Sequence, residues 1–228
     1  MSEALFDLSE EYQAMLDQGI RLSGEDMFFF LEGRLRLLES RVRSRGPVRR
    51  ILDFGCGLGY ATRRLREVFP EAEVTGADTS ESALRSARER NGAPGVRFRT
   101  VGDLESEAGG YDLCYVNGVF HHIAPEERPS ALTLIHRLLR PGGTLALFEN
   151  NPWNPGARMV MARIPFDRDA RMLSPLETAA LMKRAEFDVV RTDSLFFFPR
   201  PLKGLRFTEP YLSWTRLGAQ YAVLGART

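Results

Sequence analysis

The sequence of 228 residues has few of the residues that mark several protein classes. Its two cysteines, Cys56 and Cys114, lack the spacing of a metal site, and we expect reduced thiols in the cytosol. No apolar run approaches membrane-spanning length, and the first residues are acidic rather than a basic signal sequence. A formal net charge of +1, with acids and bases interspersed, argues against nucleic-acid binding. We therefore expect a cytoplasmic globular domain without stable membrane insertion, as a monomer or homodimer.

The most informative stretch that is present covers residues 51–60. A short apolar run contains Asp53, and the loop that follows has glycine at every second position, Gly55, Gly57 and Gly59. The residues after it read as a helix. Glycine lets the backbone turn sharply and lets a ligand approach closely, and the helix N-terminus offers unpaired N–H groups. This strand, glycine loop and helix indicate a nucleotide-type binding site in an α/β sheet.

The glycine spacing separates the candidate ligands. A dinucleotide loop has the pattern G-x-G-x-x-G, but Tyr60 occupies the place of its third glycine and would obstruct close packing. This speaks against a nicotinamide-dependent oxidoreductase. The phosphate-binding pattern G-x-x-x-x-G-K-[ST] does not occur, so a P-loop is excluded.

Apolar runs and helical patterns alternate from residue 48 onward, which favours a parallel, doubly wound sheet. The signals for helix starts are Ser23 with Asp26, and Ser174 with Pro175 and Glu177. The expected strands are 50–54, 73–77, 96–101, 112–116, 144–148, 187–197 and 220–224. The expected helices are 9–17, 27–42, 63–69, 80–90, 125–139 and one that starts at 174. Residues 149–173 contain three prolines and no clear period.

The pattern Asp53-x-Gly55-x-Gly57-x-Gly59 resembles motif I of the class I S-adenosylmethionine-dependent methyltransferases. Acids at the ends of the next two strands, and the stretches 111–123 and 138–145, resemble the later motifs of the same family. The resemblance covers about residues 48–150. It implies a Rossmann-like seven-stranded sheet whose last strand is antiparallel and inserted between strands five and six. It also implies a helical lid at 1–45 on a domain at 46–228, with 149–173 as an acceptor-site insertion.

The same resemblance implies S-adenosylmethionine as cofactor. Asp78, about 20 residues past the glycine loop, is placed to accept hydrogen bonds from ribose hydroxyls. Asp103 would meet the adenine amine, while an adjacent apolar residue packs on the ring. Arg34 is expected to contact the carboxylate of the methionine part of the cofactor. The complete set of expected cofactor-binding residues is Gly55, Cys56, Gly57, Gly59, Asp78, Thr79, Asp103, Leu104, Asn117, Gly118 and Arg34.

Two adjacent histidines, His121 and His122, follow the fourth strand, near the expected position of the methyl group. Imidazole titrates near neutral pH and suits a general base, although a histidine beside such a loop often only maintains geometry. In some quinone O-methyltransferases an acid in this region holds a metal. A histidine stands there in this chain, so no metal is expected.

The methyl acceptor is expected to be a small molecule bound by the segments outside the regular sheet. Candidate acceptor-binding residues are Tyr12, Phe29, Asn150 and Trp153. The aromatic and basic stretch 196–206 is read as a buried strand and a solvated loop, with an anionic acceptor or a membrane surface as alternative contacts.

These patterns favour methyl transfer to oxygen of a small metabolite. Nitrogen and carbon acceptors remain open, because the motifs specify fold and cofactor rather than acceptor. An alternative from another class is a methyltransferase-like binding or partner protein without activity, against which the intact glycine loop, Asp78 and Asp103 argue.

Overall fold

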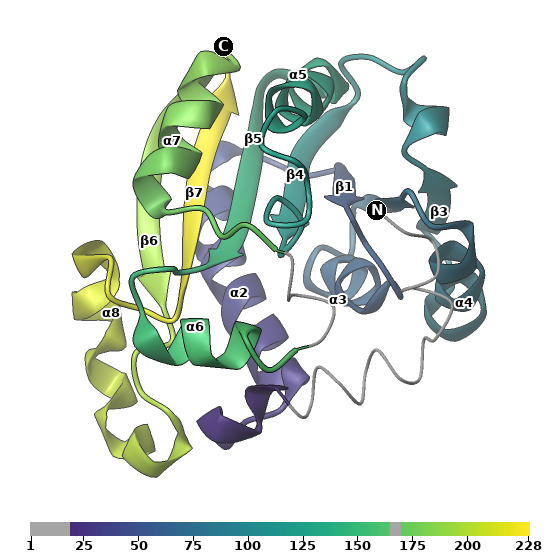
Figure 1. Ribbon diagram of the computed structural model, residues 1–228. Coiled ribbons are helices and arrows are strands. Elements are labelled where there is room, and N and C mark those ends of the chain that lie inside the picture. Colours follow the sequence, from purple (N-terminus) through teal and green to yellow (C-terminus); the bar gives the residue numbers. More distant parts are fainter. Residues whose placement is uncertain (1–18, 165–169) are drawn as a thin grey trace.

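The structure is a computed structural model that describes residues 19–164 and 170–228 (Figure 1). Its centre is a seven-stranded sheet of order β3-β2-β1-β4-β5-β7-β6. The strands are β1 Arg50–Phe54, β2 Glu73–Asp78, β3 Val96–Thr100, β4 Tyr111–Asn117, β5 Leu139–Asn150, β6 Phe187–Leu195 and β7 Gln220–Arg227. The α-helices are α2 Met27–Val42, α3 Tyr60–Val68, α4 Glu81–Asn91, α5 Arg128–Leu138, α6 Pro155–Met161, α7 Pro175–Arg184 and α8 Glu209–Leu212.

The strand directions confirm the predicted topology. Strands β1 to β5 pair in parallel, whereas β7 pairs antiparallel with both β5 and β6 and lies between them. Parallel neighbours need crossover connections, which the helices supply, and their carboxyl ends meet at one edge of the sheet. Ligands in such folds bind beyond this edge.

Both faces of the sheet are covered, as strand β4 shows. Leu113 and Tyr115 pack with the buried residues of α2 and α3, while Cys114 and Val116 pack with those of α5 and α7. All four are fully buried. Successive strand residues point to opposite faces, so a continuous apolar run fits only a sheet buried on both sides.

Helix α2 is an integral layer of this core. Leu31, Leu35 and Leu38 are buried in the same cluster as β1 and β4. Near its C-terminal end, Arg41 donates two hydrogen bonds of 3.0 and 3.1 Å to the buried carboxylate of Asp193 on β6. The predicted lid at 1–45 therefore includes a helix that belongs to the sheet-covering layer, and the predicted helix 9–17 lies outside the described residues.

The helix starts depend on short polar side chains. The predicted capping box at Ser174 and Glu177 is confirmed on α7. The start of α2 is a correction, because Asp26 is the N-cap and accepts from Phe29 N at 2.8 Å. Ser23 instead donates to the carbonyl oxygen of Ile20 at 2.7 Å, so it closes the preceding turn.

Two segments differ from the expectation. Helix α6 lies inside the stretch 149–173, where no period was found, and Asn154 caps it by accepting from Ala157 N at 3.0 Å. Strand β6 ends at Leu195 rather than 197, because Phe196 has a φ of 60° that breaks the extended backbone. The interpretation of residues 196–198 as a buried strand is therefore wrong. Figure 1 shows α6, α8 and the start of α2 gathered beside the same end of the sheet.

Candidate active site

The glycine loop after β1 adopts a backbone that suits glycine. Gly55, Gly57 and Gly59 have φ values of 76°, 51° and 78°, in the left-handed region that other residues rarely adopt. The amides of Gly55 and Cys56 both donate to Ala77 O, at 2.7 and 3.0 Å. The loop is thus fixed to the end of β2, with its turn at the carboxyl edge of the sheet.

Gly57 differs from the other two glycines in what surrounds it. A Cβ added at Gly55 or Gly59 would lie 2.3 Å from Val119 or 2.7 Å from Phe98, whereas one added at Gly57 would meet nothing within 4 Å. The space beside Gly57 belongs to two cavities, on either side of the loop. Gly57 therefore borders open space that a ligand can fill.

Asp78 ends β2 and is tied to the loop. Its carboxylate accepts from Gly57 N at 2.8 Å and from Ser80 N at 3.0 Å. With Thr79 it lines a cavity of about 1030 Å³ on the outer side of the loop. Each carboxylate oxygen has two acceptor positions, so Asp78 can hold the loop and still accept from a ligand hydroxyl.

A second cavity, of about 160 Å³, lies between the glycine loop and α2 and is lined by Asp53, Tyr115 and Arg34. The Arg34 side chain is buried and donates to the Tyr115 hydroxyl at 3.2 Å and to Gln220 Oε1 at 2.9 Å. Among residues 19–164 and 170–228, no carboxylate pairs with it. A buried guanidinium held by neutral partners is a receptor for a ligand carboxylate.

Asp53 is the acid of motif I and faces this second cavity. Burial raises the pKa of its carboxyl group to about 7. A hydrogen bond of 2.6 Å from Thr62 Oγ1 partly offsets this increase, and the charge of Asp78 adds to it. A cation placed in the cavity would favour the charged form of Asp53.

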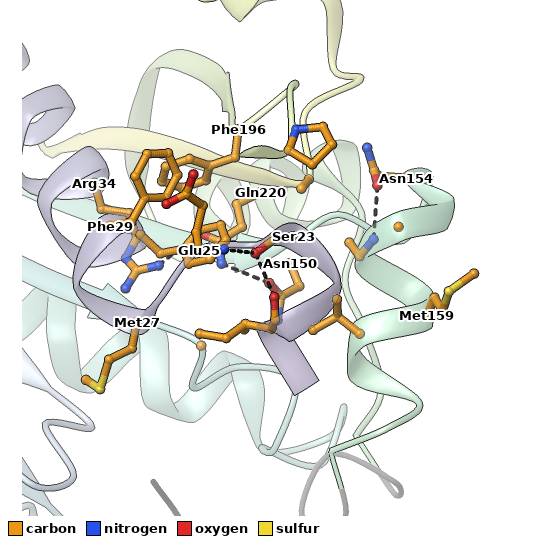
Figure 2. Close-up of a pocket in the computed structure, with 18 of the residues that line it drawn as sticks. Ser23, Glu25, Met27, Phe29, Arg34, Asn150, Asn154, Met159, Phe196 and Gln220 are labelled. Carbon is orange, nitrogen blue, oxygen red and sulfur yellow. Dashed lines mark hydrogen bonds between the residues drawn. The ribbon is translucent and has the colours of Figure 1, made fainter. Parts of the chain in front are cut away.

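A third cavity, of about 510 Å³, lies under the start of α2, α6 and the segment after β6. Figure 2 shows side chains from these elements and from the ends of β5 and β7 around one space. Its walls combine aromatic and aliphatic side chains with amides, among them Phe29, Phe196, Met159, Asn150, Asn154 and Gln220. Asn117, at the end of β4, lines all three cavities. The three spaces therefore adjoin at this residue.

His121 and His122 lie at this junction, after β4. Nδ1 of His121 is 2.5 Å from Oε2 of Glu149, and both side chains are almost fully buried. The other oxygen of Glu149 accepts from Phe120 N at 2.8 Å. A carboxylate bound to Nδ1 favours the tautomer whose Nε2 carries the lone pair, and it stabilises the protonated ring. His122 lines both the first and the third cavity.

A buried arginine holds this histidine loop in place. Arg128 donates from Nε to Phe120 O at 3.0 Å and to Ile123 O at 3.1 Å, and from Nη2 to Arg171 O at 2.6 Å. Burial lowers the pKa of Arg128, against the charges of Glu177 and Glu149. The backbone on both sides of the histidines is thus fixed by one side chain.

The structure brings most of the expected site residues to the three cavities. Those that line a cavity are Gly55, Cys56, Gly57, Asp78, Thr79, Asn117, Gly118, Arg34, His121, His122, Phe29 and Asn150. Gly59 instead begins α3 as its N-cap residue. Tyr12 lies outside the described residues.

Asp103, Leu104 and Trp153 do not line these cavities. Hydrogen bonding to the side chain of Thr100, and then to its backbone N at 3.0 Å, lowers the pKa of the Asp103 carboxyl group. Leu104 is fully buried in the core, whereas Val101 is one of the apolar residues that line the first cavity. Trp153 is half exposed outside the third cavity.

Glu149 is the main site residue that the sequence prediction missed. It stands in the stretch 145–149, LALFE, and an acid that ends a fully apolar strand is the signal that points to it. The aromatic residues at 196–198 were also missed as cavity residues. Both cysteines are buried and unbridged, and burial raises the pKa of each thiol well above its usual range.

Comparison with known proteins agrees with this geometry. Residues 51–143 match the family model described as a methyltransferase domain. A trans-aconitate 2-methyltransferase of Deinococcus radiodurans is 36% identical over 101 residues, which cover 44% of this chain and 38% of the relative. A demethylmenaquinone methyltransferase of Thermus thermophilus is 35% identical over 127 residues, covering 53% of this chain and 56% of the relative. The matches thus span about half or less of these curated relatives.

Solved structures share the fold. A TehB-like S-adenosylmethionine-dependent methyltransferase from Corynebacterium glutamicum superposes with a TM-score of 0.59 at 18% identity, covering 92% of this chain and 94% of that one. One from Archaeoglobus fulgidus gives 0.59 at 16% identity, covering 88% and 100%. This chain therefore shares its fold with these S-adenosylmethionine-dependent methyltransferases. Residues 51–143 match the methyltransferase domain model.

The described residues include neither a membrane-spanning helix nor a cluster of metal-binding side chains. None of the helices in residues 19–164 and 170–228 is both long and apolar enough to cross a membrane. The same residues contain no group of three or more His, Cys, Asp or Glu side chains that could hold a metal ion.

Proposed function

We propose that this chain transfers the methyl group of S-adenosylmethionine to a hydroxyl oxygen of a small molecule. The observation that carries the proposal is the meeting of three cavities at Asn117, with the His121–Glu149 pair on the side of the third. Two cavities beside the glycine loop suit the two halves of the cofactor. The third suits the acceptor.

The charged side chains indicate which half of the cofactor occupies each of the two cavities. The methionine carboxylate binds Arg34, which has no carboxylate partner among the described residues, and the ammonium group lies beside Asp53 in the same cavity. On the other side of the loop, Asp78 accepts from the ribose hydroxyls. Val101 packs against the adenine ring, and Asp103 is proposed as the partner of its amine.

S-adenosylmethionine supplies an activated methyl group on a sulfonium. The protein then has to align the acceptor oxygen and remove its proton. As the new C–O bond forms and the C–S bond breaks, the proton passes to Nε2 of His121. Glu149 keeps Nδ1 as the donor and stabilises the resulting imidazolium. His122 holds the wall between acceptor and cofactor cavities.

The third cavity favours a neutral acceptor with an apolar body. It contains two arginines in its described lining, Arg34 and Arg206. Arg206 is paired with Glu25 at 2.9 Å and lies 4.4 Å from the ring centre of Phe29. With Arg34 assigned to the cofactor and Arg206 paired with Glu25, the described lining offers no further arginine or lysine for the three carboxylates of trans-aconitate, the compound in the names of several relatives.

Turnover of S-adenosylmethionine with a panel of acceptors tests the proposal. The panel contains neutral phenols and alicyclic alcohols, amines and trans-aconitate, and the product mass is measured. We expect one added methyl group on a neutral hydroxyl compound, and loss of this product when His121 is replaced by Ala. Hydroxyl transfer would be contradicted if the methyl group went to an amine, a carbon or trans-aconitate and if His121→Ala did not change that rate. No turnover despite tight cofactor binding would favour a binding protein.

A further inference from the structure

Large apolar side chains are exposed in one short segment near the C-terminus. The helical segment 200–217 combines η6 Arg200–Thr208, α8 and η7 Ser213–Thr215, which follow one another without a gap. Phe207, Tyr211 and Trp214 are 74%, 78% and 76% exposed. Leu217 is 64% exposed, and Leu202 and Leu205 are about half exposed. Aromatic residues so accessible to water mark an interaction surface.

The aromatic residues recur at short intervals along the segment. Phe207 in η6, Tyr211 in α8 and Trp214 in η7 are four and three residues apart, and all three are exposed. We call these three residues the aromatic stripe. Between them, Thr208, Glu209, Leu212 and Ser213 are less exposed, whereas Pro210 is exposed.

The exposed charges of the segment itself have one sign. Arg200, Lys203 and Arg216 are exposed. The acid of the segment, Glu209, points inward, because its carboxylate accepts from the amides of Phe197 and Phe198 at 3.2 and 3.1 Å. The outer face therefore presents cations beside aromatic rings.

We propose that the helical segment 200–217 docks on an anionic lipid membrane surface. Tryptophan and tyrosine rings are suited to the headgroup region, and each Lys or Arg near an anionic surface adds attraction. A second copy of the chain fits less well, because a two-fold contact through the stripe would bring like charges together.

The position of the segment connects the membrane to the third cavity. Phe198, Pro199 and Arg206 line that cavity, and Arg206 is bound to Glu25 at the start of α2. The stripe thus begins one residue past a cavity wall. If the proposed function holds, an acceptor dissolved in the membrane surface reaches the cavity along this segment. The membrane contact itself does not depend on the proposed function.

Vesicle co-sedimentation of the full chain tests the contact. The vesicles contain phosphatidylcholine alone or a mixture with phosphatidylglycerol. We expect binding to the mixed vesicles that weakens with added salt, since exposed charges are screened. Replacing Phe207, Tyr211 and Trp214 by Ser should weaken it at least about tenfold, and Lys203→Glu should also weaken it by about tenfold.

The control is the double variant Leu176→Ser and Val190→Thr, which removes apolar side chains that are 52% and 47% exposed elsewhere on the surface. It should bind vesicles like the parent. Circular dichroism and S-adenosylhomocysteine binding of each variant verify that the fold and the cofactor site are intact. Trp153→Phe leaves Trp214 as the single tryptophan, and its emission should shift to the blue with mixed vesicles.

Two results would overturn the proposal. One is that the parent ignores anionic vesicles, or that the parent and the triple Ser variant bind them equally. The other is a dimer in sedimentation velocity that the triple Ser variant converts to monomer, which would assign the stripe to self-association. Vesicle binding with no methyl transfer would leave the membrane contact standing and refute only the proposed function.

Discussion

At the scale of single residues, Asp53 links cofactor binding to pH. Because its pKa is about 7, most of the Asp53 carboxyl group is protonated at pH values below 7. If the cofactor ammonium lies beside it, binding requires loss of this proton. Affinity for S-adenosylhomocysteine should therefore rise up to about tenfold per pH unit between about pH 5 and 7 and then level off. Calorimetric titration at several pH values measures this, and an unchanged slope in Asp53→Asn would contradict it.

The raised pKa of Asp53 also makes the stability of the ligand-free chain depend on pH. Stability falls as the pH rises, whereas cofactor affinity increases. The folded chain holds the Asp53 proton more tightly than an unfolded chain, in which the pKa is near 3.8. The stabilisation is present below about pH 4 and is lost as the pH rises to 7, by about 4 kcal/mol in the free energy of unfolding. Asp53→Asn should retain it, so this variant should gain stability over the parent at pH 8 but not at pH 4.

The pair His121 and Glu149 carries the proposed proton transfer. His121→Ala should reduce the rate by about 10²–10⁴-fold with little effect on cofactor affinity. Glu149→Gln keeps the side-chain shape but removes the charge that favours one tautomer of the His121 ring. We therefore expect the rate to fall by about tenfold or more, less than in His121→Ala. Single-turnover rates measure both. Near-parental rates in both variants would leave the histidine with a structural role.

Arg34 is the residue on which the cofactor orientation depends. Arg34→Gln removes a charged hydrogen bond to the methionine carboxylate, which is worth about 1.5–3 kcal/mol, so the dissociation constant should increase by about 10- to 150-fold. The matched control is Arg36→Gln, since Arg36 is exposed on the same helix. Equal affinity in the two variants would place the carboxylate elsewhere.

At the scale of elements, the glycines of the loop have different roles, because Gly57 borders the cavities and Gly59 is packed against the core. Gly57→Ala places its methyl in open cavity space at a φ of 51°, so we expect a folded chain that loses most cofactor affinity. Gly59→Ala places its methyl 2.7 Å from Phe98, so we expect the melting temperature to fall. Thermal melts and calorimetry distinguish the two. Cofactor binding by Gly57→Ala at the parental level would place the ligand outside these cavities.

The sequence predicts these elements where the signal is local. The strands expected at 50–54 and 73–77 depend on short apolar runs, and the cap at Ser174 depends on a short polar side chain at the helix start. Helix α6 was missed although Asn154 and Pro155 form a common helix start, because its few residues lack a period. The end of β6 depends on Phe196, whose backbone is set by what it packs against rather than by its neighbours in sequence.

At the scale of the whole molecule, the site arises from distant segments. Motif spacing predicts Gly57 and Asp78 near one cofactor, and Arg34 was expected from the N-terminal helices; the structure places all three at adjoining cavities. The sequence marks Glu149 as an acid that ends an apolar strand, but its pairing with His121 becomes visible only when β4 and β5 bring the two side chains together. The composition of the third cavity depends on α2, α6 and the segment after β6 meeting at one sheet edge, which no local pattern determines.

A crystal structure of the complex with S-adenosylhomocysteine tests the central claim most directly. We expect the homocysteine carboxylate at Arg34, the ribose at Asp78 and the sulfur directed past Asn117 toward the third cavity and His121. Such a complex would place one cofactor across the two cavities that flank Gly57. Ligand density that leaves either of these cavities empty, or a sulfur directed away from the third cavity, would contradict the account.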